Sequence, residues 1–378
     1  MISPKAFHEA LVSHGVDFFA GVPDSLLKEF CAYVDTMLPP EKHVIAANEG
    51  SAVALATGHY LATGKIAVTY LQNSGLGNTI NPLLSLADRE VYAIPMVILI
   101  GWRGAPDVKD EPQHVKQGRV TPDMLEAMEI PFRILGGDPA AAEEGAIWAV
   151  DTARACEGPV ALLVHKGAFA KSEVKRVSVE AAADFMQREE AIALITRNLQ
   201  PSATVVATTG MISRELYEQR VARKQDRSSD FLTVGSMGHA SQIALGIARA
   251  LPEADVVCLD GDGSVLMHMG GMATIGTSAI GNLFHIVLNN GAHDSVGGQP
   301  TVAFDISLTG IASACGYDFV EGPIEEEKDI EERINRLSRM RGRRFLEVRV
   351  AKGSRADLGR PKESPIENKL AFVARLRD

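Results

Sequence analysis

Short apolar segments rich in β-branched residues alternate with longer amphipathic segments along the whole chain. The apolar segments fall at 16–21, 43–47, 65–71, 95–101, 132–135, 160–165, 204–208, 231–235, 254–260, 282–289, 317–322 and 343–350. Strands that alternate with helical segments are typical of parallel α/β architecture. The pattern therefore predicts an α/β fold of two tandem doubly wound parallel sheets, with no further domain between them.

A charged segment without a clean strand pattern separates the two halves. It falls at about 171–185, and we expect it to link a first domain over 1–170 to a second over 186–378. The first helix is expected to begin after Ser3 and to end near Gly15. In open parallel sheets ligands bind beyond the carboxyl ends of the strands, so the chemistry is expected in the loops that follow the strands.

Composition narrows the class of partner. The 378 residues carry a net charge of -10, which argues against a nucleic-acid or anionic-membrane surface. Four scattered cysteines form no CxxC pair, and the apolar run at 93–102 is far shorter than the roughly 20 residues of a membrane helix. The start of the chain does not have the pattern of a signal peptide. We expect a cytoplasmic protein that binds a small molecule.

Two predicted strands end in residues that could bind a metal ion. Asp262 follows one strand between Gly261 and Gly263, and Asn289 and Asn290 follow the next strand. If these strands are neighbours, a carboxylate, an amide oxygen and a backbone carbonyl meet at one edge, a ligand set that suits Mg²⁺. Alone, the segment around Asp262 could also be an ordinary strand-to-helix turn with a capping aspartate, and the segment at 289–291 could be a second turn.

Together these segments resemble the cofactor motif of thiamine-diphosphate-dependent 2-oxo acid decarboxylases. In this chain GDG at 261–263 is followed, after twenty-five residues, by NN at 289–290. The resemblance implies that Asp262, Asn289 and the carbonyl of Gly291 hold Mg²⁺, which bridges to the diphosphate of thiamine diphosphate. It covers nearly the whole chain, although larger members of the family have a middle domain that this chain lacks.

The resemblance also implies further cofactor contacts in the second half. The amides around Gly263 and Ser264 would contact the diphosphate. A loop that leaves a strand and enters a helix is a suitable anion site on physical grounds, which favours Thr209 and Gly210.

The family also holds its cofactor bent by a bulky apolar side chain. Met237 would take that role in this chain, while the Gly235 carbonyl would accept a hydrogen bond from the cofactor's amino group. Core packing is the ordinary role of a lone methionine near a helix start.

Glu49 is the candidate for activating the cofactor. It lies between a strand and an almost uncharged helix, where an acid is often only a favourable partner of the helix dipole. The resemblance implies instead that its carboxyl group contacts the cofactor's pyrimidine ring, in a site dry enough to raise its affinity for a proton. In the family this glutamate reaches a cofactor held by another subunit. A homodimer or larger homo-oligomer, with active sites at the subunit interface, is therefore implied.

The substrate pocket is expected in the first half. Asp24 follows a strand where the resemblance puts an active-site loop, and His114 lies in a segment, 110–121, that the sequence predicts to be an exposed loop. Both are candidate catalytic groups. The candidate substrate contacts are Asn73, Ser74, Gln113 and Arg119; the cations Arg103, Lys109 and Lys116 are further candidates for an anionic tail.

The expected reaction is the decarboxylation of 3-phosphonopyruvate to phosphonoacetaldehyde and CO₂. The segment HDSVGGQPT at 293–301 favours this branch of the family. Sulfopyruvate is the alternative substrate, because both acids carry a tetrahedral anionic tail. Two other classes stay open: a non-catalytic protein that binds thiamine diphosphate, and a Rossmann-type nucleotide binder, although the first strand is not followed by a clean GxGxxG.

Overall fold

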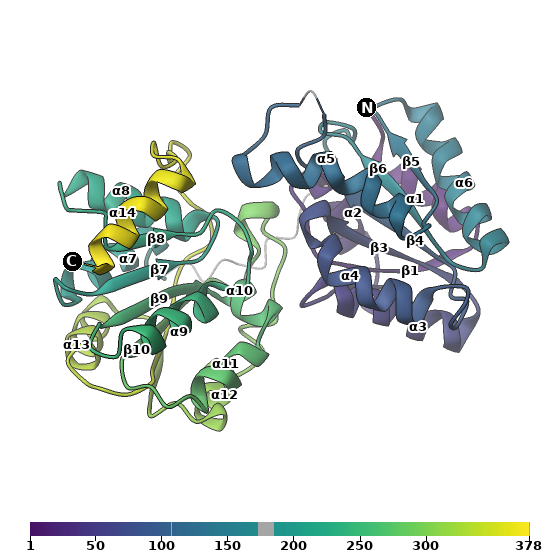
Figure 1. The fold of residues 1–378 in the computed structure, drawn as a ribbon. Helices are drawn as coiled ribbons and strands as arrows, with labels where there is room; N and C mark the ends of the chain where they lie inside the picture. The colour runs from purple at the N-terminus through teal and green to yellow at the C-terminus, as the bar shows by residue number, and fades with distance from the viewer. Residues whose placement is uncertain (107, 173–184, 378) are drawn as a thin grey trace. The chain divides into compact units, whose positions relative to one another are not determined.

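The computed structural model describes residues 1–106, 108–172 and 185–377 (Figure 1). The chain divides into two compact units, Met1–Ser178 and Val179–Asp378. The division falls inside the predicted linker at 171–185, of which residues 173–184 lie outside the described part. Among the described helices, none has the length and apolar character that crossing a membrane requires.

The first unit is built on six parallel strands in the order β2-β1-β3-β4-β6-β5. The strands are β1 (Val16–Gly21), β2 (His43–Ile45), β3 (Ile66–Gln72), β4 (Met96–Gly101), β5 (Phe132–Leu135) and β6 (Pro159–Val164). From β1 the chain first adds β2 on one side and then adds β3 and the later strands on the other side. The direction in which strands are added therefore reverses between β1 and β3. A reversal of this kind leaves a crevice at the carboxyl ends of the two strands, where ligands bind in such sheets.

Helices cover both faces of this sheet. Helices α1 (Pro4–Ser13), α2 (Lys28–Met37) and α6 (Pro139–Cys156) pack on one face through side chains such as Phe7, Phe30 and Val150. The other face is covered by α3 (Glu49–Thr63), η1 (Asn73–Gly75), α4 (Leu76–Pro82), η2 (Leu83–Ala87) and α5 (Pro112–Ala127). Burial on both faces explains why β4, MVILIG, is continuously apolar.

The second unit repeats this plan, with strand order β11-β12-β10-β9-β7-β8. Its parallel strands are β7 (Thr204–Ala207), β8 (Asp230–Leu232), β9 (Val256–Gly261), β10 (Leu283–Asn289), β11 (Phe319–Ile324) and β12 (Arg344–Arg349). Starting from β8, the order β8-β7-β9-β10-β12-β11 corresponds to the order β2-β1-β3-β4-β6-β5 of the first unit. The order therefore reverses between β7 and β9, which are the strands that lead to Thr209 and Asp262.

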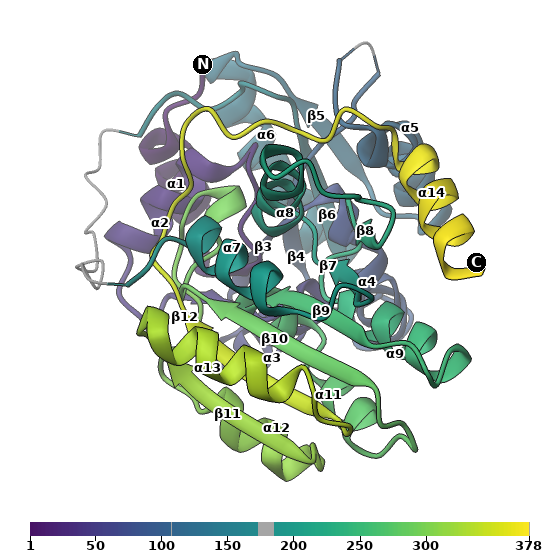
Figure 2. The same cartoon turned by 90° about the vertical axis from the view of Figure 1, so that its left-hand side faces the viewer.

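Two groups of helices enclose the second sheet. Helices α7 (Arg188–Asn198), α8 (Met211–Ala222) and α13 (Glu327–Leu337) pack on one face (Figure 2). The other face is covered by α9 (Ala240–Ala250), α10 (Asp262–Met267), α11 (Gly270–Gly276) and α12 (Leu308–Cys315). A short helix, η3 (Asp294–Val296), lies in the loop after β10, and α14 (Pro365–Arg377) packs beside the edge strand β8.

The fold predicted from the sequence is confirmed. Each of the twelve predicted segments overlaps a strand, and both sheets are parallel with helices on both faces. The first helix begins at Pro4, with the Ser3 side chain accepting a hydrogen bond from the Ala6 amide at 3.4 Å.

One structural prediction is wrong. The segment 110–121 is not an exposed loop, because α5 begins at Pro112 and continues to Ala127. Proline is favourable in the first turn of a helix, where its missing N–H has no intrahelical partner in any case. His114 is consequently buried in that first turn rather than exposed on a loop.

Candidate functional site

The predicted diphosphate residues meet where β7 and β9 diverge. Gly210, which follows Thr209, is the N-cap of α8, and Ser264 lies in the first turn of α10. The hydroxyls of Thr208 and Ser264 are 3.0 Å apart, and the Gly238 amide donates to Ser264 Oγ at 3.1 Å. Three loops are thereby held together at the reversal point of the sheet, where an anion can approach two helix N-termini.

Gly263 leaves little room for a side chain in this arrangement. A Cβ atom on Gly263 would lie 3.1 Å from the His293 ring and 3.3 Å from Cε of Met237. The half-buried Met237 side chain therefore lies close to the loop that begins α10, and its role as a wedge stays a prediction. Gly235 is half-buried and lies two residues earlier, after β8.

Asp262 is a buried carboxylate. It is 2 % exposed, it accepts a hydrogen bond from the Thr301 hydroxyl at 2.5 Å, and the Asn290 amide also bonds to it. Burial raises its pKa to about 6, against the opposing effect of these hydrogen bonds. These partners carry no positive charge, so a cation at this carboxylate would favour its ionised form.

The residues after β10 bring further oxygen atoms to the same edge. Leu288 pairs with Gly261 across the two strands, so Asn289 at the end of β10 and Asp262 just after β9 directly follow this pair. Gly291 has φ +62°, and its carbonyl accepts the Thr301 amide at 2.9 Å, which closes the loop back towards Asp262. A carboxylate, an amide and a backbone carbonyl are hard oxygen ligands, and this donor set fits Mg²⁺.

Glu49 is the first residue of α3 in the first unit. Its side chain is 5 % exposed and accepts a hydrogen bond from Asn78 Nδ2 at 2.7 Å, while Asn48 caps the helix. Burial raises the pKa of Glu49 in spite of that hydrogen bond. A Cβ atom on Gly75 would lie 2.0 Å from Glu49 Oε1, so the carboxyl group occupies space that only glycine leaves free.

Asp24 lies at the reversal point of the first sheet, between the ends of β1 and β3. It is fully buried and accepts hydrogen bonds from Gln72 Nε2 at 2.6 Å and from the Leu26 amide at 2.8 Å. Burial raises its pKa, although these hydrogen bonds oppose the shift. Asp24 and Glu49 are thus two buried carboxyl groups that follow neighbouring strands.

The loop after β4 contains an ion pair that the sequence did not reveal. The Arg103 guanidinium makes two hydrogen bonds to the Asp110 carboxylate, one of them at 2.7 Å, and a third to Ser25 Oγ at 2.9 Å. Burial alone would raise the pKa of Asp110, but the bonds from Arg103 and from backbone amides outweigh it and hold that pKa well below its ordinary value. Arg103 therefore fixes this loop beside the segment that carries Asp24.

The predicted substrate residues fall into two groups. Asn73 is buried and bonds to both backbone groups of Arg103 and to Thr121 Oγ1 at 3.0 Å, so its amide joins three segments. Ser74 is exposed and donates to Gln72 Oε1 at 2.7 Å.

The other predicted residues belong to α5. Gln113 is half-buried, Arg119 is exposed, and His114 Nδ1 lies 3.4 Å from Gln117 Oε1. Burial lowers the pKa of His114, so its imidazole is mainly neutral near pH 7.

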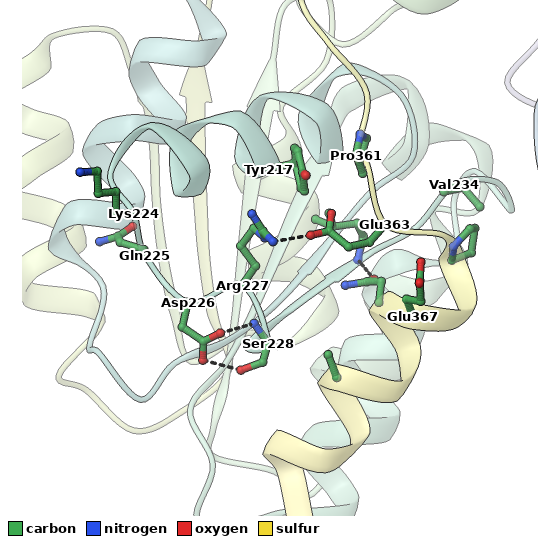
Figure 3. A pocket seen from close by; sticks show the side chains of 14 residues that line it. Tyr217, Lys224, Gln225, Asp226, Arg227, Ser228, Val234, Pro361, Glu363 and Glu367 are labelled. Carbon is green, nitrogen blue, oxygen red and sulfur yellow. Dashed lines mark hydrogen bonds and ion pairs between the residues drawn. The ribbon is translucent and has the colours of Figure 1, made fainter.

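A well-formed cavity lies elsewhere in the second unit. It has a volume of about 380 Å³ and is bounded by α8, β8 and α14 (Figure 3). None of the predicted site residues lines it, and several of its charged groups have partners nearby: Arg227 pairs with Glu363, and Asp226 accepts hydrogen bonds from Ser228. We therefore assign the chemistry to the strand ends and not to this cavity.

Comparison with known proteins agrees with this geometry. Residues 4–127 match the family described as thiamine pyrophosphate enzyme, N-terminal TPP binding domain, and residues 206–348 match the corresponding C-terminal TPP binding domain. The chain is 35% identical to a phosphonopyruvate decarboxylase of Streptomyces viridochromogenes, over 99% of this chain and 95% of that protein.

Two further relatives extend over nearly the whole chain. A phosphonopyruvate decarboxylase of Streptomyces hygroscopicus is 34% identical over 97% of this chain and 92% of its own length. A sulfopyruvate decarboxylase of Methanosarcina acetivorans is 31% identical over 92% of this chain and 90% of its own length. The chain therefore belongs to the same family as these proteins, the thiamine-diphosphate-dependent decarboxylases.

Proposed function

We propose that this protein decarboxylates 3-phosphonopyruvate to phosphonoacetaldehyde and CO₂, with thiamine diphosphate and Mg²⁺. The observation that carries the proposal is the pair of buried carboxyl groups, Glu49 and Asp262, each at the start of a helix that follows a parallel strand. Full-length similarity to two phosphonopyruvate decarboxylases supports the choice of substrate.

The second unit would hold the cofactor. Asp262, Asn289 and the Gly291 carbonyl would bind Mg²⁺; Thr209, Gly210, Gly263 and Ser264 would contact the diphosphate; Gly235 and Met237 would contact the rings. When bound, the thiazolium ring accepts the electron pair that remains when CO₂ leaves. The protein's part is orientation and electrostatics.

The first unit would supply the proton chemistry and the substrate contacts. The raised pKa of Glu49 suits a group that holds a proton against a ring nitrogen in a dry site. The raised pKa of Asp24 suits an acid that donates a proton late in the catalytic cycle. The neutral imidazole of His114 could accept a proton or a hydrogen bond. Ser74, Gln113 and Arg119 would contact the substrate, and Asn73 would hold the surrounding loops.

The decisive experiment substitutes Glu49. We expect E49A to bind thiamine diphosphate and Mg²⁺ with nearly normal affinity and to lose more than about 100-fold in kcat, because one positioned acid or base contributes 10²–10⁴-fold. CO₂ release from phosphonopyruvate measures kcat, and calorimetry measures the binding. An E49A protein that turned over at the wild-type rate would overturn the proposal.

Sulfopyruvate is a second candidate substrate, favoured by the similarity to the Methanosarcina acetivorans protein. Turnover of phosphonopyruvate, sulfopyruvate and pyruvate by one preparation separates the candidates. We expect kcat/KM to be highest for phosphonopyruvate. Cofactor binding without CO₂ release from any of these acids would indicate a non-catalytic protein instead.

We also propose a homodimer or larger homo-oligomer with active sites at the subunit interface. The outer surface of α3 supports this, because after Glu49 the helix has no Asp, Glu, Lys or Arg and exposes Ala54, Leu55 and Leu61. Leu84 of η2 is a further exposed apolar side chain in this part of the unit. A cytoplasmic location is consistent with the scattered positions of the four cysteines, which form no CxxC pair.

A further inference from the structure

The side-chain amide of Asn289 is held by a carboxylate from another strand. Its Nδ2 donates to Glu347 Oε1 at 2.8 Å, and its Oδ1 accepts the Gly291 amide at 3.0 Å. Glu347 is 3 % exposed and lies on β12, the strand that pairs with β10. Because an ionised carboxylate can only accept, this contact fixes which end of the Asn289 amide carries the oxygen facing the loop.

Asn290 is held in the same way by Asp294. Its Nδ2 donates to Asp294 Oδ2 at 2.6 Å, and its Oδ1 accepts the Ala292 amide at 3.0 Å. The same carboxylate oxygen accepts the Gly353 amide at 2.9 Å. Each of the two asparagines therefore gives its N–H group to a carboxylate and turns its oxygen towards the backbone of the metal loop.

A buried arginine holds Asp294 in place. Arg188 is 4 % exposed and donates from Nη1 to Asp294 at 2.8 Å, while Nε and Nη2 bind both oxygens of Glu215 at 2.8 and 2.9 Å. Nη2 also donates to the Gly353 carbonyl at 3.1 Å. These contacts join the start of α7, the helix α8, the metal loop and the segment after β12.

The net stability of such a network does not explain its presence. The free energy lost when charged groups leave water is nearly as large as the free energy of their mutual attraction. Apolar residues of the same size often give a protein of equal stability. Partners of metal ligands, by contrast, are well known to set the orientation of those ligands and the affinity for the metal. The contact of the Asn290 backbone amide with Asp262 links this network directly to the predicted metal carboxylate.

We propose that Glu347 and the Arg188-held Asp294 are positioning residues for the metal and diphosphate site. This inference rests on the proposed function. Glu347 orients Asn289, and Asp294 orients Asn290 and the turn that follows it. Loss of the Glu347 contact leaves the Asn289 oxygen free to rotate, and loss of the Asp294 contact loosens the turn that carries the Gly291 carbonyl. The cost of either loss therefore appears as weaker Mg²⁺ binding.

Two variants test the proposal, each with a matched control. E347L removes the closer acceptor of Asn289 and leaves the Ala303 carbonyl at 3.4 Å, while E347Q keeps an oxygen that can accept. R188M/E215L removes the arginine without leaving a buried charge on α8, and R220M/D230L does the same to a second buried pair of this unit. That pair has contacts of 2.8 and 3.1 Å and lies on α8 and β8 instead of the metal loop.

The measurement is the Kd for Mg²⁺, by calorimetric titration at saturating thiamine diphosphate, with Tm of the cofactor-free protein as a second readout. We expect E347L and R188M/E215L to raise Kd by about 10- to 100-fold. E347Q should raise it less, and R220M/D230L should leave it unchanged at a similar Tm. With excess Mg²⁺, E347L should recover most of its kcat.

The outcomes separate two failures. If the wild-type protein does not bind Mg²⁺ with thiamine diphosphate, the proposed function fails and this inference falls with it. If the wild type binds but E347L and R188M/E215L bind equally well, the inference alone is overturned. The same follows if R220M/D230L weakens binding as much as they do. If one variant does not fold, the other decides the question.

Discussion

Gly75 is the residue whose missing side chain matters most directly to Glu49. A methyl group there would lie 2.0 Å from the Glu49 carboxyl oxygen, so G75A must displace that carboxyl group. A shift of about 1 Å in a catalytic group costs on the order of 100-fold in rate. We expect G75A to lower kcat by about that factor while cofactor affinity changes little.

A neighbouring glycine supplies the control. Gly77 is exposed in α4, and a Cβ atom there has no atom within 4 Å. G77A should keep the wild-type kcat and raise stability by about 0.5–1 kcal/mol, because alanine favours a helix. Steady-state kinetics and Tm for both proteins test the pair, and equal kcat values for G75A and wild type would contradict the prediction.

Burial of His43 should make the stability of the protein depend on pH. Its ring is buried next to Tyr70, 2.7 Å from the phenolic oxygen, and burial lowers its pKa to about 4. The unfolded chain takes up a proton near pH 6.5, whereas the folded chain does so only near pH 4. Stability is therefore full above pH 6.5 and falls as the pH drops towards 4, by about 3 kcal/mol at most for this residue.

The variant H43Q isolates that contribution. Glutamine does not titrate, so Tm of H43Q should fall less steeply than Tm of the wild type between pH 6.5 and 4. Thermal unfolding at several pH values measures the difference. Parallel curves for the two proteins would show that His43 does not carry the effect.

At the residue scale the sequence predicted the groups that lie at strand ends and missed their supports. Asp262, Asn289 and Glu49 were found because each follows an apolar segment at a recognisable spacing. Glu347 was missed because it lies inside a strand, and its role depends on which strand pairs with β10. Asp294 had a signal, since it stands four residues after Asn290, but its arginine is 106 residues away in sequence.

Among the helices, α14 has an unusual role beside the edge strand β8. Asn368 accepts the Leu232 amide at 3.1 Å and donates to the Asp230 carbonyl at 2.9 Å, so one side chain pairs with the backbone as a neighbouring strand would. Open strand edges are templates for unwanted pairing, and this contact covers part of the edge.

We expect N368A to destabilise the protein by about 1–3 kcal/mol, because two backbone groups of a partly buried strand lose their partner. K369A changes the exposed neighbour on the same helix and should be close to neutral. Chemical denaturation measures both variants. Equal stability of N368A and K369A would show that the edge does not depend on this side chain.

The elements themselves were largely predictable, with one instructive exception. Strands buried on both faces are continuous runs of Val, Ile and Leu, and such runs stand out in the sequence. Helix α5 was missed because its first half, PQHVKQGR, is largely polar. The burial of α5 depends on the loop after β4, where the Asn73 side chain forms hydrogen bonds with the Arg103 backbone. A contact between residues thirty positions apart cannot be predicted from the local sequence pattern.

On the scale of the whole molecule, the predicted site is divided between two units. The proposed shared active site makes a prediction for mixed oligomers. E49Q lacks the acid of the first unit and D262N lacks the metal carboxylate of the second. In a random mixture of dimers half of the dimers contain one chain of each kind, and each of these has one intact site of two if sites form between chains.

We therefore expect co-expressed E49Q and D262N chains to reach about a quarter of the wild-type activity, although each variant alone is nearly inactive. The rate of CO₂ release by the purified mixture measures this activity. At a protein concentration low enough for dimers to dissociate, the mixture should lose the activity that it has above the single variants. If the mixture stays as inactive as the single variants, the site is not shared between chains.

The identical strand order of the two units has an evolutionary consequence. Each unit presents its loops at the same reversal point, but the proposed substrate contacts lie in one unit and the metal and diphosphate contacts in the other. Mutations that alter the preferred acid can therefore accumulate in the first unit while cofactor binding stays under separate selection. An architecture with this division is readily evolvable, and enzymes for phosphonate and sulfonate acids can diverge by changing loops in one half alone.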